Sequence, residues 1–460
     1  MSRDRVAILI ACVVVVVPRL LRWGEVPVVV DGDEAAFFAF GIAEYANRSP
    51  IWSFGPNSLP NAHLWLMGLA DALLGRDIWS ARLVTALFGA AQAAALVAAS
   101  ARLAGGMGAL TTAAVLCLPM ELHFERLAMC NVWTTATWSM AFALAVLAPW
   151  RIWSSAAIGV LLAAGWYGYQ SSRLVPVIVA LPLLVLLLRA TWRQWLAIGV
   201  GGLSSLLALA PLLYGFWLMP TKFSGRATDT SWLSANADPA AVQLHLWATL
   251  SAFTGTGFDL TGFFPYHLPL FPLLVTLLAV VGLAAARSLP LALCLAVWIA
   301  SVMFGNFIRN IPIYSCVLVC AVPAVAAAAG LSARWLGVAA PLLAALAVFP
   351  LTAAYFELGA HVPQSRRFAM AHLGALRAVP HDAPLLVGGG VPCDHGFNRL
   401  HRPCFNLEDP DAPRPPGAWA VIFPDMAAVA DSIPGERRTE DWYGIPVIVI
   451  SPPPAAPPPA

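Results

Sequence analysis

The feature that most constrains this chain is an apolar segment of roughly 20 residues, the length that a helix needs to cross the hydrocarbon core of a bilayer, repeated along the sequence between short polar breaks. Only 11% of the residues are charged, against about 25% in soluble domains, which excludes an ordinary cytosolic enzyme. We predict eleven transmembrane helices, at residues 6–23, 82–101, 105–123, 131–149, 153–170, 173–189, 195–218, 267–286, 289–307, 310–331 and 335–355. The fifth and sixth segments share a break at 170–173, so one long helix is an alternative there.

The basic residues predict how the helices are oriented. Cytoplasmic connections of membrane proteins are enriched in Lys and Arg. If the N-terminus is inside, every inner connection carries arginine, at Arg3, Arg5, Arg102, Arg151, Arg189, Arg193, Arg287 and Arg334. All acidic residues except Asp4 then fall outside. The segment before Pro18 has no convincing signal-peptide cleavage site, so we expect an uncleaved first helix.

The polar parts of the chain divide it into domains. We predict a transmembrane domain over residues 1–355, with two large external loops at 24–81 and 219–266. Basic residues are scattered singly and the net charge is only +2, which gives nucleic acid no basic run to bind. The chain is therefore expected to contact lipid rather than nucleic acid.

The region after the last apolar segment reads as a small extracytoplasmic α/β domain over residues 356–450. A polar helical pattern covers 364–378, and strand patterns cover 384–387, 418–423 and 445–450. Cys393 and Cys404 lie in this region and could form a disulfide in an oxidising compartment. The final segment 451–460, SPPPAAPPPA, is predicted to be disordered.

Three carboxylates follow the first apolar segment directly, at Asp31, Asp33 and Glu34. Apolar residues recur at helical spacing just beyond them, which predicts an amphipathic helix over 34–46 lying in the membrane interface. Such a helix would hold the acids at headgroup depth. Alternatively, Asp33 and Glu34 only cap this helix, where its dipole favours negative charge.

Three arginines oppose the inside bias of the other basic residues. Arg126, Arg173 and Arg309 lie at the outer ends of predicted helices. Each could extend to lipid headgroups, but ionisable groups at membrane depth tend to be functional. Because the guanidinium fork matches a phosphate group, these arginines on the same face as Asp33 indicate group transfer from a lipid phosphate.

The order of these motifs resembles the polyprenyl-phosphate-sugar glycosyltransferases of the GT-C superclass, especially bacterial relatives of protein mannosyltransferases and aminoarabinose transferases (glycosyltransferase family 39-like). The most specific motif is WYGYQSSRLVP at 166–176. The others are Asp33-Glu34, LPNAHLW at 59–65 with LG at 74–75, ARL at 81–83, FERLAMCN at 124–131, and the segment from Arg309 to Pro323. The resemblance covers about residues 1–335, and the tail is matched only in type.

The resemblance implies a GT-C fold and a mechanism. Asp33 would be the general base that deprotonates an external acceptor hydroxyl, with inversion, while Glu34 would orient the acceptor or bind a cation. Arg173, with Arg126 or Arg309, would stabilise the departing lipid phosphate. Further substrate contacts are expected at His63, Tyr169, Lys222 and Arg226, although His63 also fits an ordinary interfacial histidine and the last two fit solvated loop charges.

The resemblance also implies the partners and the location. The donor would be a polyprenyl-phosphate sugar, the acceptor an envelope glycan, lipid or protein, and the location the bacterial inner membrane. Asn131 stands where aminoarabinose transferases carry an acid, and His63 lies where many members have a Pro-rich pair. Since the family has metal-assisted and metal-independent members, the sequence leaves a divalent metal open.

Three other functions compete with this interpretation. A glycan polymerase or ligase would use a diphosphate-linked donor, which the residues alone do not exclude. A lipid or solute transporter would want acids at the bilayer midplane, and the predicted helices have none there. A noncatalytic scaffold would need no carboxylate at Asp33. The sugar and the acceptor stay open.

Overall fold

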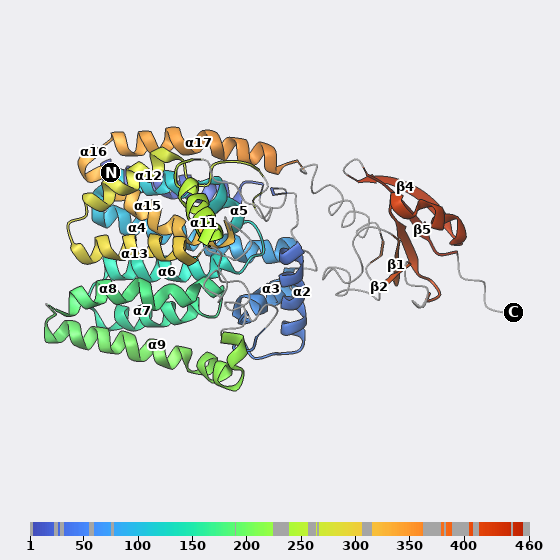
Figure 1. Ribbon diagram of the computed structural model, residues 1–460, viewed down its shortest axis with the longest axis horizontal. Helices are drawn as coiled ribbons and strands as arrows, with labels where there is room; N and C mark the ends of the chain where they lie inside the picture. The colour runs from blue at the N-terminus through green and yellow to red at the C-terminus, as the bar shows by residue number, and fades with distance from the viewer. Residues whose placement is uncertain are drawn as a thin grey trace.

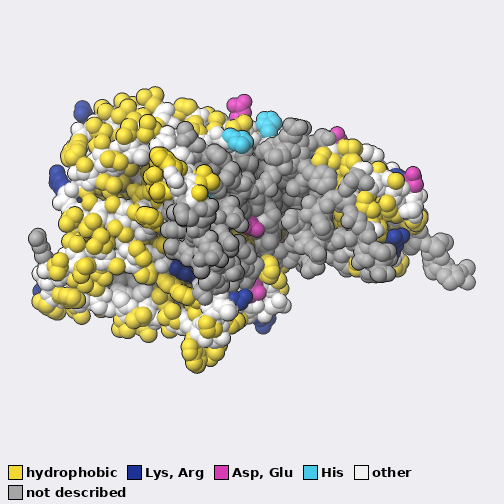
Figure 2. Space-filling model, viewed as in Figure 1, with side chains coloured by type: hydrophobic (Ala, Val, Ile, Leu, Met, Phe, Trp, Pro, Cys, Tyr) yellow, Lys and Arg dark blue, Asp and Glu magenta, His cyan; other side chains and the backbone are white. Residues whose placement is uncertain are grey.

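The computed structural model of this chain forms a helical bundle with a small sheet at one end (Figure 1). The structure describes residues 3–22, 26–27, 32–54, 59–74, 78–188, 190–223, 239–255, 264, 266–305, 315–361, 379–380, 383–388, 404–407, 414–442 and 445–453. One face of the bundle is covered mainly by hydrophobic side chains with few charges among them (Figure 2). This surface suits contact with lipid.

In the first half of the bundle, the described residues form helices with these bounds: α1 (Arg3–Leu20), α2 (Gly32–Ala46), α3 (Ala62–Leu74), α4 (Ile78–Val115), α5 (Pro119–Glu125), α6 (Asn131–Leu147), α7 (Ile152–Gly165), α8 (Val175–Leu187) and α9 (Trp192–Leu218). The short 3-10 helix η2 (Gln170–Leu174) precedes α8. The second half contains α11 (Pro239–Ala252), α12 (Leu273–Ala284), α13 (Leu289–Gly305), α14 (Ser315–Leu318), η3 (Val319–Ala321), α15 (Val322–Leu331), α16 (Ala333–Leu336) and α17 (Ala339–Gly359).

Each predicted transmembrane segment overlaps apolar helix in this bundle. The second segment and most of the third lie in the element α4, whose helix is interrupted at the non-helical Gly105, where φ is 71°; this positive φ suits glycine. The break predicted between 101 and 105 is therefore confirmed, while the end of the third segment lies in α5. The fifth and sixth segments are the separate helices α7 and α8. In the described part of the chain, five stretches are long and apolar enough to cross a membrane: Ile78–Val115, Gln170–Leu187, Trp192–Leu218, Ser315–Leu336 and Ala339–Gly359. The count of eleven spans stays a prediction.

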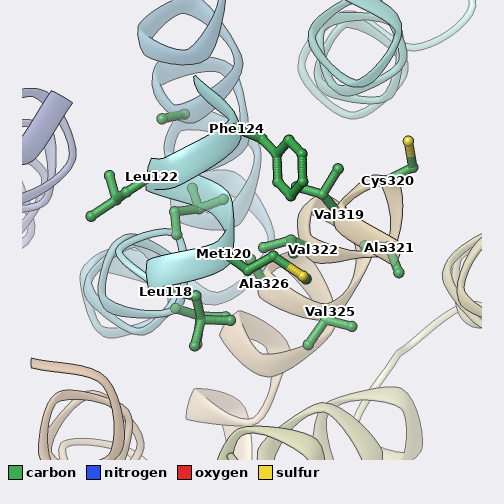
Figure 3. Packing of buried hydrophobic residues seen from close by; sticks show 14 of the residues in the cluster. Leu118, Met120, Leu122, Phe124, Val319, Cys320, Ala321, Val322, Val325 and Ala326 are labelled. Carbon is green, nitrogen blue, oxygen red and sulfur yellow. The ribbon is translucent and has the colours of Figure 1, made fainter. Parts of the chain in front are cut away.

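The centre of the bundle is built around α15, whose ten residues are all buried. Its sequence VPAVAAAAGL is made mostly of small residues, which let membrane helices approach closely. A Cβ atom added at Gly282 of α12 would lie 1.7 Å from the carbonyl oxygen of Ala328. The α5 residues Met120 and Phe124 also pack toward η3 and the start of α15 (Figure 3).

The described residues of the C-terminal region form a five-stranded sheet in the order β2-β1-β3-β5-β4. Its strands are β1 (Leu385–Gly388), β2 (Cys404–Asn406), β3 (Trp419–Ile422), β4 (Glu436–Trp442) and β5 (Ile445–Ser451). β1 is parallel to both β2 and β3, while β5 is antiparallel to both β3 and β4. Side chains of β5 alternate between two apolar clusters, one for each face of the sheet.

The sheet confirms the three predicted strands as β1, β3 and β5. The predictions of a helix at 364–378 and of a disulfide from Cys393 fall outside the described residues. Helix α17 runs to Gly359, past the predicted domain boundary at 355. Ser451, predicted to begin the disordered end, is the last residue of β5, and the segment from 454 lies outside the described residues.

Candidate active site

The candidate site is built on the first turn of α2, which carries Asp33 and Glu34. The prediction of a helix over 34–46 is confirmed, with α2 beginning two residues earlier. Acidic residues in a first turn are favoured by the partial positive charge of the helix N-terminus. The two carboxylates nevertheless have different surroundings, since Glu34 is fully buried while Asp33 is half-buried.

Glu34 is held by an ion pair inside the bundle. Its Oε1 and Oε2 accept hydrogen bonds from Nε and Nη2 of Arg82, at 2.6 and 2.8 Å. The backbone N–H of Ala128 donates a further bond to Oε1, at 2.7 Å. Because both oxygens are engaged by the chain, Glu34 links α2 to α4 and to the segment between α5 and α6.

Arg82 extends this link to the connection between α1 and α2. Its Nη1 donates to the Pro27 carbonyl oxygen at 2.6 Å, and its guanidinium lies 4.5 Å from the centre of the Trp79 ring. The sequence pointed to Arg82 only as part of a motif and gave it no partner. Arg82 is only 1% exposed. Because it binds both Glu34 and Pro27, it fixes the start of α2.

Asp33 lies close to the segment that precedes α6. Burial, and then the negative charge of Asp33, raise the pKa of the Cys130 thiol. Cys130 is the N-cap residue of α6, and no side chain caps this helix start. The half-buried Asp33 therefore lies near the start of α6.

Arg126 is buried, and its contacts in this structure are with the chain itself. Its guanidinium donates to the carbonyl oxygens of Val26 at 2.7 Å, Leu21 at 2.6 Å and Pro18. It also lies 5.0 Å from the centre of the Phe356 ring. Among the described residues, no carboxylate is within ion-pair distance. Arg126 thus anchors the end of α1, and phosphate binding by it stays a prediction.

Arg173 lies in η2 and contacts the beginning of the second predicted external loop. Its guanidinium donates to the carbonyl oxygens of Phe223 and Lys222, the second at 3.3 Å. It also lies 5.2 Å from the centre of the Phe223 ring. The Lys222 side chain is half-buried. Arg226 and Arg309, the other predicted basic contacts, lie outside the described residues.

His63 is a buried residue of α3 rather than an exposed interfacial one. Its side chain is 2% exposed, and the Tyr167 backbone lies near its ring nitrogens without meeting the geometry of a hydrogen bond. Burial lowers the pKa of His63 to about 3, although the Tyr167 backbone opposes the shift. The ring is therefore neutral at pH 7, with Phe37 edge-on to it at 6.4 Å.

Tyr169 stands in the turn between α7 and η2, within the motif that is most specific for the resemblance. Its backbone N–H donates to Thr134 Oγ1 of α6 at 2.8 Å. Its ring is partly buried against the main core. The bond brings the WYGYQSSRLVP turn next to the beginning of α6, and so to the same end of the bundle as Asp33.

A second buried ion pair links α1 to α5, and the sequence gave it no role. Arg19, at the end of α1, contacts Glu125 of α5 at 2.7 Å. One turn earlier on α5, Glu121 accepts a bond from Gln92 of α4. The sequence does mark this pair, because Glu121 and Glu125 are the only acids in a long apolar stretch. Charges at such depth in a membrane need partners.

An aromatic cluster borders the same end of the bundle. The His123 ring has Phe264, Tyr266 and Tyr355 edge-on around it, with ring centres 5.3 to 5.9 Å away. The hydroxyls of Tyr266 and Tyr355 have no hydrogen-bond partner among the described residues. These residues join α5, the end of the second loop and α17, a long-range grouping that no local pattern reveals.

Metal binding finds no support in the described residues. They contain no group of three or more His, Cys, Asp and Glu side chains that could hold an ion. Glu34, one of the predicted cation ligands, has both oxygens committed to Arg82 and Ala128.

This chain resembles known proteins in its fold. No family model and no curated protein matches the chain. ArnT from Cupriavidus metallidurans bound to undecaprenyl phosphate superposes with a TM-score of 0.63 at 16% identity, over 97% of both chains. Its apo state gives 0.62 over the same shares.

A more distant structural neighbour is the oligosaccharyltransferase of Archaeoglobus fulgidus in its apo form. The TM-score is 0.53 at 13% identity, over 87% of this chain and 64% of that one. ArnT and the oligosaccharyltransferase are both GT-C proteins. At such identities the likeness concerns the fold, and it agrees with the apolar helices and the sheet domain described above. The chain is a multi-pass membrane protein with the GT-C fold.

Proposed function

We propose that this chain is a membrane glycosyltransferase that moves a sugar from a polyprenyl phosphate to a hydroxyl on the extracytoplasmic side. The observation that carries the proposal is the contrast between Asp33 and Glu34 on one helical turn. Glu34 is locked in a buried pair with Arg82, so the turn is fixed and Asp33 stays half-buried. The GT-C fold shared with ArnT bound to undecaprenyl phosphate supports the donor class.

In the proposed reaction, Asp33 is the general base. Its carboxylate takes the proton of the acceptor hydroxyl while the hydroxyl oxygen forms a bond to the anomeric carbon of the sugar. The bond from that carbon to the phosphate oxygen breaks on the opposite face, with inversion. The polyprenyl phosphate leaves with the electron pair, and its negative charge increases by one.

Arg173 would stabilise this charge, because fixed cations act most strongly where charge develops. Its guanidinium already contacts the entry to the second loop at Lys222 and Phe223, so a donor phosphate there would lie beneath that loop. Arg309, and Arg126 after rearrangement, are further candidates. Arg226 and the Lys222 ammonium would close over the donor.

The remaining residues would shape the site. Glu34 would position Asp33 through its ion pair with Arg82. This role replaces the contact with the acceptor or a cation that the sequence predicted for Glu34. The neutral His63 ring and Tyr169 would border the sugar. The site would face the outside of a bacterial inner membrane, where a lipid-linked donor removes the need for a nucleotide-binding loop.

The test is sugar transfer in proteoliposomes. Wild type, Asp33→Asn and the control Glu357→Gln, which changes an exposed acid of α17, would be supplied with radiolabelled polyprenyl-phosphate sugars and envelope acceptors. We expect transfer by wild type and by the control. Asp33→Asn should lose at least a hundredfold in kcat/KM, within the range of general-base catalysis, without a change in thermal unfolding.

Other outcomes would redirect the assignment. Full activity of Asp33→Asn would remove Asp33 as the base. Transfer only from diphosphate-linked donors, included in the same panel, would favour the polymerase or ligase alternative. Movement of lipid across the bilayer without any transfer would favour a transporter.

A further inference from the structure

Asn131 is the first residue of α6, and its side chain is only 1% exposed. Its Nδ2 donates to the carbonyl oxygen of Cys316, at 3.2 Å. This bond fixes which way the amide is turned, since only the nitrogen can donate. The other amide atom, Oδ1, has no hydrogen-bond partner among the described residues.

A buried acceptor without a partner is uncommon, because it has lost its bond to water and gained none in return. Such an atom is explained by an ordered water or by a ligand that donates a hydrogen bond. The amide is held in place by the Cys316 carbonyl, which suits a fixed recognition group better than a mobile one.

Asn131 and Asp33 lie on either side of one contact between α2 and the segment before α6. The Ala128 N–H, three residues before Asn131, donates to Glu34, the neighbour of Asp33 on α2. The charge of Asp33 also acts on Cys130, the residue directly before Asn131. A molecule bound at this contact would therefore lie near both residues.

We propose that Asn131 is a specificity-determining residue whose Oδ1 accepts a hydrogen bond from a hydroxyl of the donor sugar. This inference rests on the proposed glycosyltransferase function and names its substrate class: an uncharged, hydroxyl-bearing sugar. A sugar with an ammonium group at that position would be buried beside a neutral amide.

The nearby acids do not change this conclusion. Glu34 is already neutralised by Arg82, and Asp33 would cease to be a base if it paired with an ammonium group. A buried charge without a partner is strongly disfavoured. The site therefore selects against amino sugars at the position that Asn131 contacts.

The test compares two donors on one polyprenyl phosphate, a neutral pentose and the same pentose with one hydroxyl replaced by an amine. The quantity measured is the ratio of kcat/KM values for the two donors, which does not depend on the amount of folded protein. Wild type should prefer the neutral sugar. Asn131→Leu should lower kcat/KM for the neutral donor at least tenfold, and Asn131→Asp should shift the ratio at least tenfold toward the amino sugar.

The matched control is Thr135→Val, which removes a hydroxyl one turn along α6 that bonds the Val132 carbonyl of its own helix; its donor ratio should equal that of wild type. An unchanged ratio in Asn131→Asp together with unchanged neutral-donor kcat/KM in Asn131→Leu would overturn the inference. So would a wild-type preference for the amino sugar. If wild type transfers neither sugar nor any other in the panel, the proposed function itself fails, which is a separate result.

Discussion

Adjacent residues with the same charge have different physical roles at the start of α2. The sequence predicted both Asp33 and Glu34 as catalytic, because two carboxylates beside a membrane helix look alike in a pattern. The difference comes from Arg82, which lies 48 positions away from Glu34 along the chain. Local periodicity carries no information about such a pair, so only the fold could separate the two roles.

Glu34→Gln should therefore affect stability more than Asp33→Asn does. Removing one partner of a buried pair leaves the other charge uncompensated and costs about 3–5 kcal/mol. We expect a clear drop in the thermal unfolding temperature of Glu34→Gln in detergent. The matched control is Glu440→Gln, which breaks the partly exposed pair with Arg438 and should cost about 0–1 kcal/mol. Equal shifts in the two variants would mean that the buried pair does not fix α2.

His63 predicts a pH dependence of stability. Its pKa is about 3 in the folded protein and about 6.5 when unfolded, so between these values the unfolded chain binds the extra proton. Stability should rise with pH across this window and be lost as pH falls through it, by up to about 1.4 kcal/mol per pH unit. His63→Leu should flatten this part of the profile. His361→Gln, which removes an exposed histidine, serves as control, and the same slope in His63→Leu would exclude the assignment.

At the scale of elements, hydropathy predicted helices well and their boundaries less well. Segments 82–101 and 105–123 were separated at a charged residue and glycines, and the helix of α4 is interrupted there, at the non-helical Gly105. The end of the second of these segments was predicted less well, because α4 ends at Val115 and a separate helix, α5, begins at Pro119. Apolar content sets where helix forms, whereas the interruption depends on the backbone of a single glycine. In the sheet, β4 was missed because its sequence ERRTEDW has no apolar alternation, as suits an edge strand that charged residues protect.

The contact between α12 and α15 makes a prediction about Gly282. Any side chain there meets the Ala328 backbone, which cannot move aside without separating the helices. Gly282→Ala should destabilise the protein by about 1–3 kcal/mol or more, as overpacking does. Gly199→Ala in α9, where a Cβ meets nothing within 4 Å, should be neutral or stabilising. Thermal unfolding of both variants measures the difference, and similar values would contradict close packing at Gly282.

At the scale of the whole molecule, the buried charges gather at one end of the bundle and hold the chain between α1 and α2. Arg126 and Arg82 bind carbonyls of that connection, and Arg19 ties the end of α1 to Glu125 of α5. Of these residues, the sequence identified Arg126 as a charge out of place, included Arg82 only in a motif and gave Arg19 no role. It could not show that they bind one another rather than a ligand, because that depends on how distant helices meet.

The positive-inside pattern predicts that this end of the bundle faces the outside, and cysteine labelling tests it. Helix α7 begins at one end of the bundle and α17 ends at the other (Figure 1). Arg151, just before α7, and His361, just after α17, are both exposed. In a background without the eight native cysteines, His361→Cys should react with a membrane-impermeant maleimide in intact cells. Arg151→Cys should react only after lysis. The reverse pattern would put Asp33 in the cytoplasm, where the inner leaflet would have to present the donor, and the proposed acceptor outside the cell membrane would be out of reach.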